Sequence, residues 1–204
     1  KFYFPMQLDF RGRYYYRPPF LNPQGNDIGR SLLQFADGKP ISNESELNWL
    51  RVHGANVFGH GKLNLQQRID WVVQNEQQID SCGQNPWVHL EFWSKAKDPW
   101  QFLAFCHAYQ QFLKHGFGYV CQLPVVLDCT CSGIQHYSAL LRSESMGKLV
   151  NLVDTDQPAD IYTTILLKVL DRLREDAQAG NQHAESWLQL NIDRTLLKPV
   201  VMTV

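Results

Sequence analysis

The chain is organised around residues 123–133, which read LPVVLDCTCSG. The aliphatic run from Val125 to Leu127 is typical of a buried strand. Asp128 follows directly, and a turn of small polar residues then leads to apolar side chains spaced like one face of a helix. This order of strand, acid, tight turn and helix would hold one carboxylate rigidly at a sheet edge.

The residue type of Asp128 allows two interpretations. Mg²⁺ binds in proteins through one or two carboxylates together with substrate phosphates. A strand-end aspartate also serves as a turn residue or as a helix cap. The local sequence leaves both roles open.

Composition predicts a globular chain with a core. Of 204 residues, 44% are hydrophobic and 19% are charged. The formal net charge is −1, so no overall basic bias indicates nucleic-acid binding. Residues 1–30 differ, because five cations there outnumber two acids. Such a segment either binds a polyanion or forms a solvated surface.

The five cysteines are odd in number and lack the spacing of a disulfide framework, which indicates reduced thiols. Cys129 and Cys131 have no second pair, so the sequence does not predict a zinc site. No apolar run is long enough to span a bilayer, so we expect no membrane partner. The chain starts with Lys1 and stops just after an apolar run, so we expect it to be an excised segment of a longer protein.

The first 17 residues are rich in aromatic side chains. Two β-prone runs flank residues 9–13 and predict a hairpin or bent strand with Gly12 at the bend. Arg11 and Arg13 lie between the aromatic residues, a pattern that suits a nucleic-acid groove with arginines on phosphates and rings on sugars or bases. The alternative is an aromatic edge of the core with solvated arginines.

Apolar periodicity predicts a series of helices. His53 and His60 lie near glycines without a carboxylate or cysteine at matching spacing, so we expect packed or exposed histidines rather than metal ligands. Gly116 is expected to end one helix, and Pro158 to occupy the first turn of another. The expected helices cover residues 27–35 with Asp27 as the cap, 45–57, 65–79, 101–115 and a long segment from about residue 158, followed by a polar loop.

Arg194 and Lys198 are four residues apart and would project from one face of a helix. Two cations on one face form a clamp for a triphosphate, with arginine as a fork and lysine as a point charge. Pro199 allows a helix that begins near Lys198 instead. A pair of solvated cations is the alternative.

Taken together, several motifs resemble one family, the bacteriophage-type single-subunit RNA polymerases, which also occur in mitochondria and plastids. They follow the order and spacing of that family and cover nearly the whole chain. The matching segments are FPMQLDFRGRYY (4–15), LNPQGND (21–27), LLQFADGKPI (32–41), WLRVHGAN (49–56), DPWQFLAFC (98–106), LPVVLDCTCSGIQHYSALLR (123–142), VNL (150–152) and RTLLKPVVMT (194–203).

The resemblance implies a helix-rich α+β fold, part of a right-hand polymerase, with a small antiparallel sheet that carries Asp128. Residues 1–153 would belong to the palm, and residues 154–204 to the start of the fingers. The implied activity is template-directed transfer of nucleotidyl groups from ribonucleoside triphosphates to an RNA 3′-end on double-stranded DNA. The sequences NPQGND and HGAN are more similar to those of phage members than to those of mitochondrial ones. We therefore expect the protein to act in the cytoplasm of a bacterial or phage-infected cell rather than in an organelle.

The resemblance also assigns catalytic residues. Asp128 matches the first catalytic carboxylate, which would bind two Mg²⁺ ions, one lowering the pKa of the attacking 3′-hydroxyl and one stabilising the leaving pyrophosphate. The backbone carbonyl of Cys129 matches a further metal ligand, at a position where the family usually has glycine. Arg194 and Lys198 match the residues that hold the incoming triphosphate, and Lys198 would also protonate the pyrophosphate.

Arg11 and Arg13 match the arginines of a DxxGR element that follows the template–product hybrid, with Asp9 orienting them. The second catalytic aspartate of the family, on a later hairpin, has no match in this chain, and the sugar-selecting tyrosine would lie past Val204. We therefore expect the chain alone to be inactive and to need the rest of the polymerase or a complementary subunit. The alternatives are a non-catalytic nucleic-acid-binding module, one half of a split polymerase, or a DNA polymerase of the same superfamily.

Overall fold

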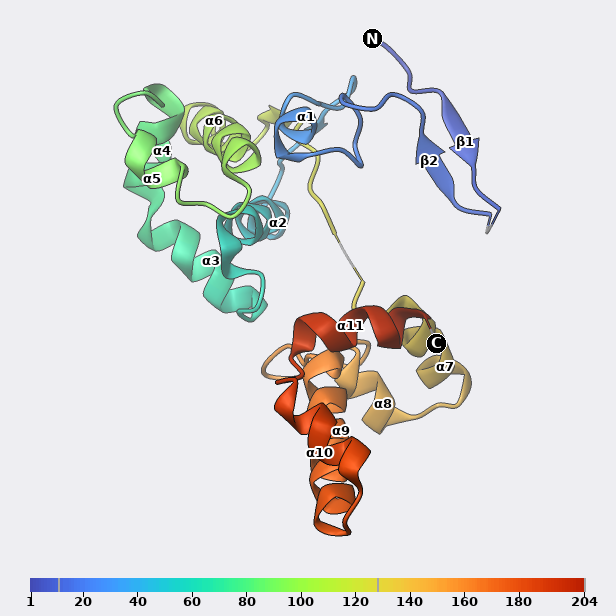
Figure 1. Ribbon diagram of the computed structural model, residues 1–204. Coiled ribbons are helices and arrows are strands. Elements are labelled where there is room, and N and C mark those ends of the chain that lie inside the picture. The colour runs from blue at the N-terminus through green and yellow to red at the C-terminus, as the bar shows by residue number, and fades with distance from the viewer. Residues whose placement is uncertain (11, 128, 204) are drawn as a thin grey trace. The chain divides into compact units, whose positions relative to one another are not determined.

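The computed structural model describes residues 1–10, 12–127 and 129–203. They form a helix-rich α+β structure, as predicted, and it contains two small antiparallel sheets. The chain divides into two compact units, Lys1–Leu127 and Asp128–Val204 (Figure 1). The division of the chain into palm and fingers at residue 153 stays a prediction. None of the helices in the described residues is long and apolar enough to cross a membrane.

The first unit begins with the predicted hairpin. Strand β1 (Met6–Leu8) pairs antiparallel with β2 (Tyr14–Tyr16). Gly12 takes a positive φ of 76° in the bend, a conformation that costs glycine little. The Asp9 carboxylate accepts the Arg13 backbone N–H at 2.9 Å and so fixes the turn.

The predicted buried strand at residues 125–127 is wrong. The second sheet pairs β3 (Lys39–Pro40) with β4 (Val120–Cys121) and ends there. Val125, Val126 and Leu127 are 37%, 41% and 73% exposed. A β-prone run becomes a strand only where a neighbouring strand takes its backbone N–H and C=O groups, and no described strand lies beside this one. Asp128, which the sheet was expected to carry, lies outside the described residues.

Helix α1 (Asp27–Ser31) is shorter than predicted, and its cap is Asn26, whose side chain accepts the Gly29 N–H. Asp27 stabilises a different helix, α6 (Pro99–His115). The Asp27 carboxylate accepts the backbone N–H groups of Trp100 at 2.8 Å and Gln101 at 3.0 Å. Those groups lie in the first turn of α6, which leaves them without partners inside the helix.

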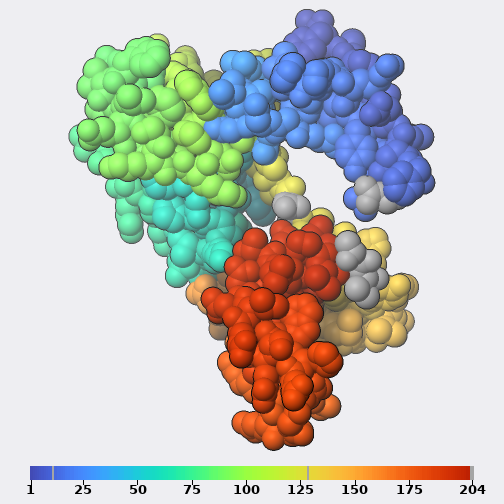
Figure 2. All heavy atoms as spheres, in the orientation of Figure 1, coloured from blue at the N-terminus to red at the C-terminus, as the bar shows by residue number. Residues whose placement is uncertain are grey.

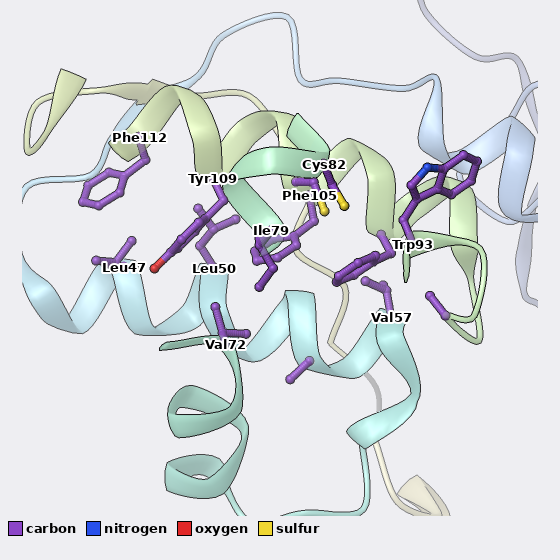
Figure 3. Close-up of a cluster of buried hydrophobic side chains, with 14 of the residues drawn as sticks. Leu47, Leu50, Val57, Val72, Ile79, Cys82, Trp93, Phe105, Tyr109 and Phe112 are labelled. Carbon is purple, nitrogen blue, oxygen red and sulfur yellow. The ribbon is translucent and has the colours of Figure 1, made fainter. Parts of the chain in front are cut away.

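The core of the first unit lies between α2 (Glu44–Ala55), α4 (Glu76–Gln84) and α6, whose labelled side chains point toward one another (Figure 3). A π-helical turn η1 (Asn56–His60) follows α2, and a short α5 (Leu90–Trp93) precedes α6. His53 is buried, and His60 stacks on Phe58 and packs at a tilt against Trp71, so packed histidines are confirmed. The fully buried residues include Leu47, Val72, Ile79, Cys82, Phe102, Phe105, Cys106 and Tyr109.

The single helix predicted for residues 65–79 is two helices, α3 (Leu65–Gln74) and α4, which meet at Asn75. The Asn75 side-chain amide donates to the Trp71 carbonyl at 2.7 Å. Asparagine competes for backbone groups in this way, and the competition interrupts a helix that apolar periodicity alone would continue.

Gly54 allows a close contact between α2 and α6. A Cβ atom built at Gly54 would overlap the ring of Phe105, which is fully buried. We expect Gly54→Ala to lower the free energy of unfolding by about 1–3 kcal/mol, because the ring has no space to move into. Gly61→Ala is the matched control in this unit, since its Cβ would meet only Asn56 Oδ1 at 3.7 Å. Urea denaturation measures both, and equal effects would contradict the prediction.

The second unit contains α7 (Ser132–Leu140), α8 (Glu144–Leu149), α9 (Ile161–Gln178), α10 (Gln182–Gln189) and α11 (Arg194–Thr203). Its buried cluster consists of Val150, Ile161 and Tyr162. Helices α9 and α10 form a narrow orange-red lobe of this unit (Figure 2). Helix α9 begins after Asp160 rather than at Pro158, and α10 occupies the stretch predicted as a polar loop.

Candidate triphosphate-binding site

Arg194 and Lys198 lie one turn apart on α11, which begins at Arg194. The Asp193 carboxylate accepts the Leu196 N–H at 2.8 Å and caps the helix. The alternative start near Lys198 is therefore wrong. Pro199 lies inside the helix, where its missing N–H removes one backbone hydrogen bond.

The ring of Tyr162 lies beneath both cations. The Arg194 guanidinium carbon is 5.3 Å from the ring centroid, and Lys198 Nζ is 5.5 Å from it. These are cation–π distances, so the ring face attracts both charges. Tyr162 is buried at the start of α9 and packs with Val150 and Ile161, which makes it a fixed support.

Asp160 holds the guanidinium of Arg194. Arg194 Nε donates to Asp160 Oδ2 at 2.6 Å, and Nη2 donates to Oδ1 at 3.3 Å. The carboxylate also caps α9 by accepting the N–H groups of Tyr162 and Thr163. Burial would raise the pKa of Asp160, but the hydrogen bonds and charge of Arg194, together with hydrogen bonds from Thr163, lower it below its usual value.

The turn that follows Asp128 lies against the same scaffold. The Asn151 side chain donates to Thr130 Oγ1 at 3.0 Å and to the Ala159 carbonyl at 2.9 Å. Cys131, which takes a positive φ of 53°, packs against the buried cluster that contains Tyr162. Burial and the hydrogen bond with the Cys131 thiol raise the pKa of Tyr162. The second unit therefore brings residues 130–131 together with the ring that supports Arg194 and Lys198.

The charge of this surface is positive on its Lys198 side. Arg194 is paired with Asp160, whereas no carboxylate of the described residues forms an ion pair with Lys198. An ammonium group without a counter-charge attracts an anion more strongly than a paired one. The arrangement can therefore bind phosphate oxygens with one lysine and one arginine.

The remaining predicted site residues lie elsewhere or are not described. Arg13 is exposed on the hairpin of the first unit, and Arg11 and Asp128 lie outside the described residues. Cys129 is exposed, in the turn before α7. Whether Asp9 orients the arginine side chains stays a prediction, because the bond it makes with Arg13 reaches the backbone.

The described residues contain no group of three His, Cys, Asp or Glu side chains that could hold a metal ion. Asp128 supplies one carboxylate, a hard oxygen ligand of the kind that Mg²⁺ binds together with phosphate oxygens. This donor type fits the ion implied by the resemblance, and further ligands would have to come from substrate or from other parts of a polymerase.

Three residues of the site were not predicted: Asp160, Tyr162 and Asn151. An aspartate before an apolar-periodic segment is a helix-cap signal, and Asp160 does cap α9. That signal gives no information about Arg194, which pairs with it from 34 positions along the chain. The contact arises from tertiary packing of α11 on α9.

Comparison with known proteins gives relatives over the full chain. A family model described as DNA-dependent RNA polymerase matches residues 39–204. A DNA-directed RNA polymerase of Enterobacteria phage T3 is 37% identical, over 99% of this chain and 25% of its own length. The mitochondrial DNA-directed RNA polymerase of Neurospora crassa is 42% identical, over 99% of this chain and 14% of its own length. The mitochondrial DNA-directed RNA polymerase of Schizosaccharomyces pombe is 40% identical, over 100% of this chain and 18% of its own length.

These matches confirm the resemblance seen in the motifs. Phage and mitochondrial polymerases match at similar identities. The chain spans a quarter or less of the length of these relatives. It therefore belongs to the DNA-dependent RNA polymerase family that includes these phage and mitochondrial enzymes.

Proposed function

We propose that this chain is the segment of a single-subunit RNA polymerase that binds the incoming ribonucleoside triphosphate and contributes the first catalytic carboxylate. The observation that supports this most directly is the pair of cations on α11. Arg194 and Lys198 share the ring of Tyr162, in the same unit as the turn that follows Asp128. In the intact enzyme the reaction joins a ribonucleotide to an RNA 3′-end on a DNA template.

Each residue has a separate task in this proposal. Arg194 binds phosphate oxygens through its guanidinium fork, and Lys198 binds them as a point charge. Lys198 also holds the proton that the leaving pyrophosphate takes up. Asp128 and the Cys129 carbonyl would hold Mg²⁺, which supplies Lewis-acid stabilisation of the attacking 3′-oxygen and of the leaving group.

The hairpin of the first unit is proposed to contact the template–product hybrid through Arg11 and Arg13. Arg13 is exposed there, and the nearby rings of Tyr3 and Phe10 are 90% and 96% exposed. Exposed rings next to arginines suit base stacking combined with phosphate contacts. The exposure favours this interpretation over an aromatic edge of the core.

The test is RNA extension from a primed DNA template with labelled ribonucleotides and Mg²⁺. We expect no product from the chain alone, because a single carboxylate without the second aspartate holds two metal ions poorly, and product once a polypeptide with the second aspartate is added. Templated RNA from the chain alone would contradict the first expectation. No product in any mixture would contradict the proposal as a whole.

A nucleic-acid-binding module without catalysis is the second candidate, and the exposed hairpin favours it. It predicts binding to a DNA–RNA hybrid that depends on Arg13 and does not depend on Asp128. Hybrid binding is measured by fluorescence anisotropy beside the extension assay. Binding without extension in every mixture supports the module, whereas extension on complementation supports the polymerase segment, including one half of a split enzyme.

A further inference from the structure

The Asp160 carboxylate occupies only one edge of the Arg194 guanidinium. A guanidinium has five N–H donors arranged in a rigid plane. Nε and one N–H of Nη2 are directed to Asp160, at 2.6 Å and 3.3 Å. One N–H of Nη1 and the second N–H of Nη2 therefore form a fork at the far end of the guanidinium, which suits a phosphate group.

Asp160 is itself held in place. Its Oδ1 accepts the backbone N–H groups of Tyr162 at 3.1 Å and Thr163 at 3.4 Å. Its Oδ2 accepts the Thr163 hydroxyl at 3.2 Å. The carboxylate is thus fixed to the first turn of α9, and Arg194 on α11 is oriented by a group that belongs to another helix.

We propose that Asp160 is a positioning residue, which orients Arg194 so that its open edge and Lys198 bind one polyphosphate together. The inference rests on the proposed function, since it assumes that Arg194 and Lys198 are the triphosphate ligands. Asp160 does not touch the ligand. Its part is to fix the guanidinium plane against the Tyr162 ring before the ligand arrives.

The positioning role and simple electrostatics predict opposite changes in polyphosphate affinity when Asp160 is neutralised. A carboxylate beside an anion site repels the anion, so neutralising it should tighten binding. A positioning carboxylate instead removes the cost of ordering a long arginine side chain when the ligand binds. If positioning dominates, neutralising Asp160 weakens polyphosphate binding although it removes a negative charge.

The experiment is calorimetric titration of the 204-residue chain with inorganic tripolyphosphate. We expect Asp160→Asn to raise Kd on the order of fivefold. Asparagine is as good a helix cap as aspartate, so α9 keeps its start. Asp160→Ser also keeps the cap and is the second variant in case asparagine perturbs the fold. Circular dichroism at the titration temperature checks that each variant keeps its helix content.

Asp193→Asn is the matched control. It removes one negative charge close to Arg194, where the carboxylate bonds the Leu196 N–H and caps α11. We expect it to leave Kd unchanged or to lower it. An increase in Kd as large as that for Asp160→Asn would show that the effect is general and would overturn the proposal.

A double-mutant cycle separates positioning from a structural effect. We expect Arg194→Ala to raise Kd and Asp160→Asn to cause no further change in the Arg194→Ala background. Tighter binding by Asp160→Asn, or an equal effect with and without Arg194, would overturn the positioning role alone. No binding by the unmodified chain, or no effect of Arg194→Ala, would overturn the proposed triphosphate site and the positioning role with it.

Discussion

Asp128→Asn is expected to lower templated RNA extension by the complemented polymerase on the order of 10³-fold. Asparagine keeps the size of the side chain but loses the charge that binds the metal ion. A catalytic metal contributes several kcal/mol to the transition state, and each 1.36 kcal/mol is a tenfold change in rate. The rate of single-nucleotide addition at saturating Mg²⁺ and nucleotide measures the effect.

Asp171→Asn provides the control for loss of one negative charge. Asp171 lies on the exposed surface of α9, where it pairs with Arg174. We expect Asp171→Asn to leave the rate of single-nucleotide addition within about twofold of that of the unmodified chain, because surface substitutions of this kind have small effects. An unchanged rate in Asp128→Asn would remove Asp128 from the catalytic mechanism. If binding to the DNA–RNA hybrid were the only activity, and Asp128→Asn left its affinity unchanged or raised it, the binding module would be favoured.

His53 is expected to make the first unit less stable as the pH falls from 6.5 to 4. Burial, with the positive charge of Arg30, lowers the pKa of His53 to about 4. The unfolded chain takes up this proton near pH 6.5 and the folded chain only near pH 4, so the neutral histidine stabilises the fold above pH 6.5. The loss across that interval is on the order of 3 kcal/mol, at about 1.4 kcal/mol for each pKa unit.

Urea denaturation between pH 7 and pH 4, followed by tryptophan fluorescence, measures this loss. Five of the six tryptophans lie in residues 1–127, so the signal reports mainly on the first unit. His53→Gln should reduce the slope of unfolding free energy against pH, whereas His107→Gln, at an exposed position, should keep it. Identical slopes for all three proteins would exclude His53 as the source.

His53 and Arg30 both line a cavity of about 640 Å³ in the first unit.

Local patterns predicted local structure well in this chain. The hairpin follows from β-prone runs around Gly12, and α6 follows from an apolar stripe that Gly116 ends. The strand predicted at residues 125–127 is wrong because a strand depends on a partner that composition does not identify. The cap predicted at Asp27 is wrong for a similar reason, since its carboxylate accepts the Trp100 N–H of a helix distant in sequence.

In the candidate site, too, local sequence patterns predict local structure but not tertiary contacts. The spacing of Arg194 and Lys198 placed both on one helix face, which is a property of α-helical geometry alone. Asp160 and Tyr162 were missed because their contacts with α11 depend on how two helices pack. The sequence predicts which residues bear the expected chemistry, whereas the contacts that Asp160 and Tyr162 make with Arg194 and Lys198 come only from the structure.

Because Cys82 and Cys106 are buried, the chemical modification of their thiols reports on local opening of the first unit. Both are 0% exposed in the core of the first unit, whereas Cys129 is exposed in the second. A thiol reacts with an alkylating reagent only when the reagent reaches it, so buried thiols are modified only while their surroundings are open. Mass spectrometry of each alkylated cysteine over time would therefore report the opening of the first unit and the accessibility of the turn after Asp128 in one sample.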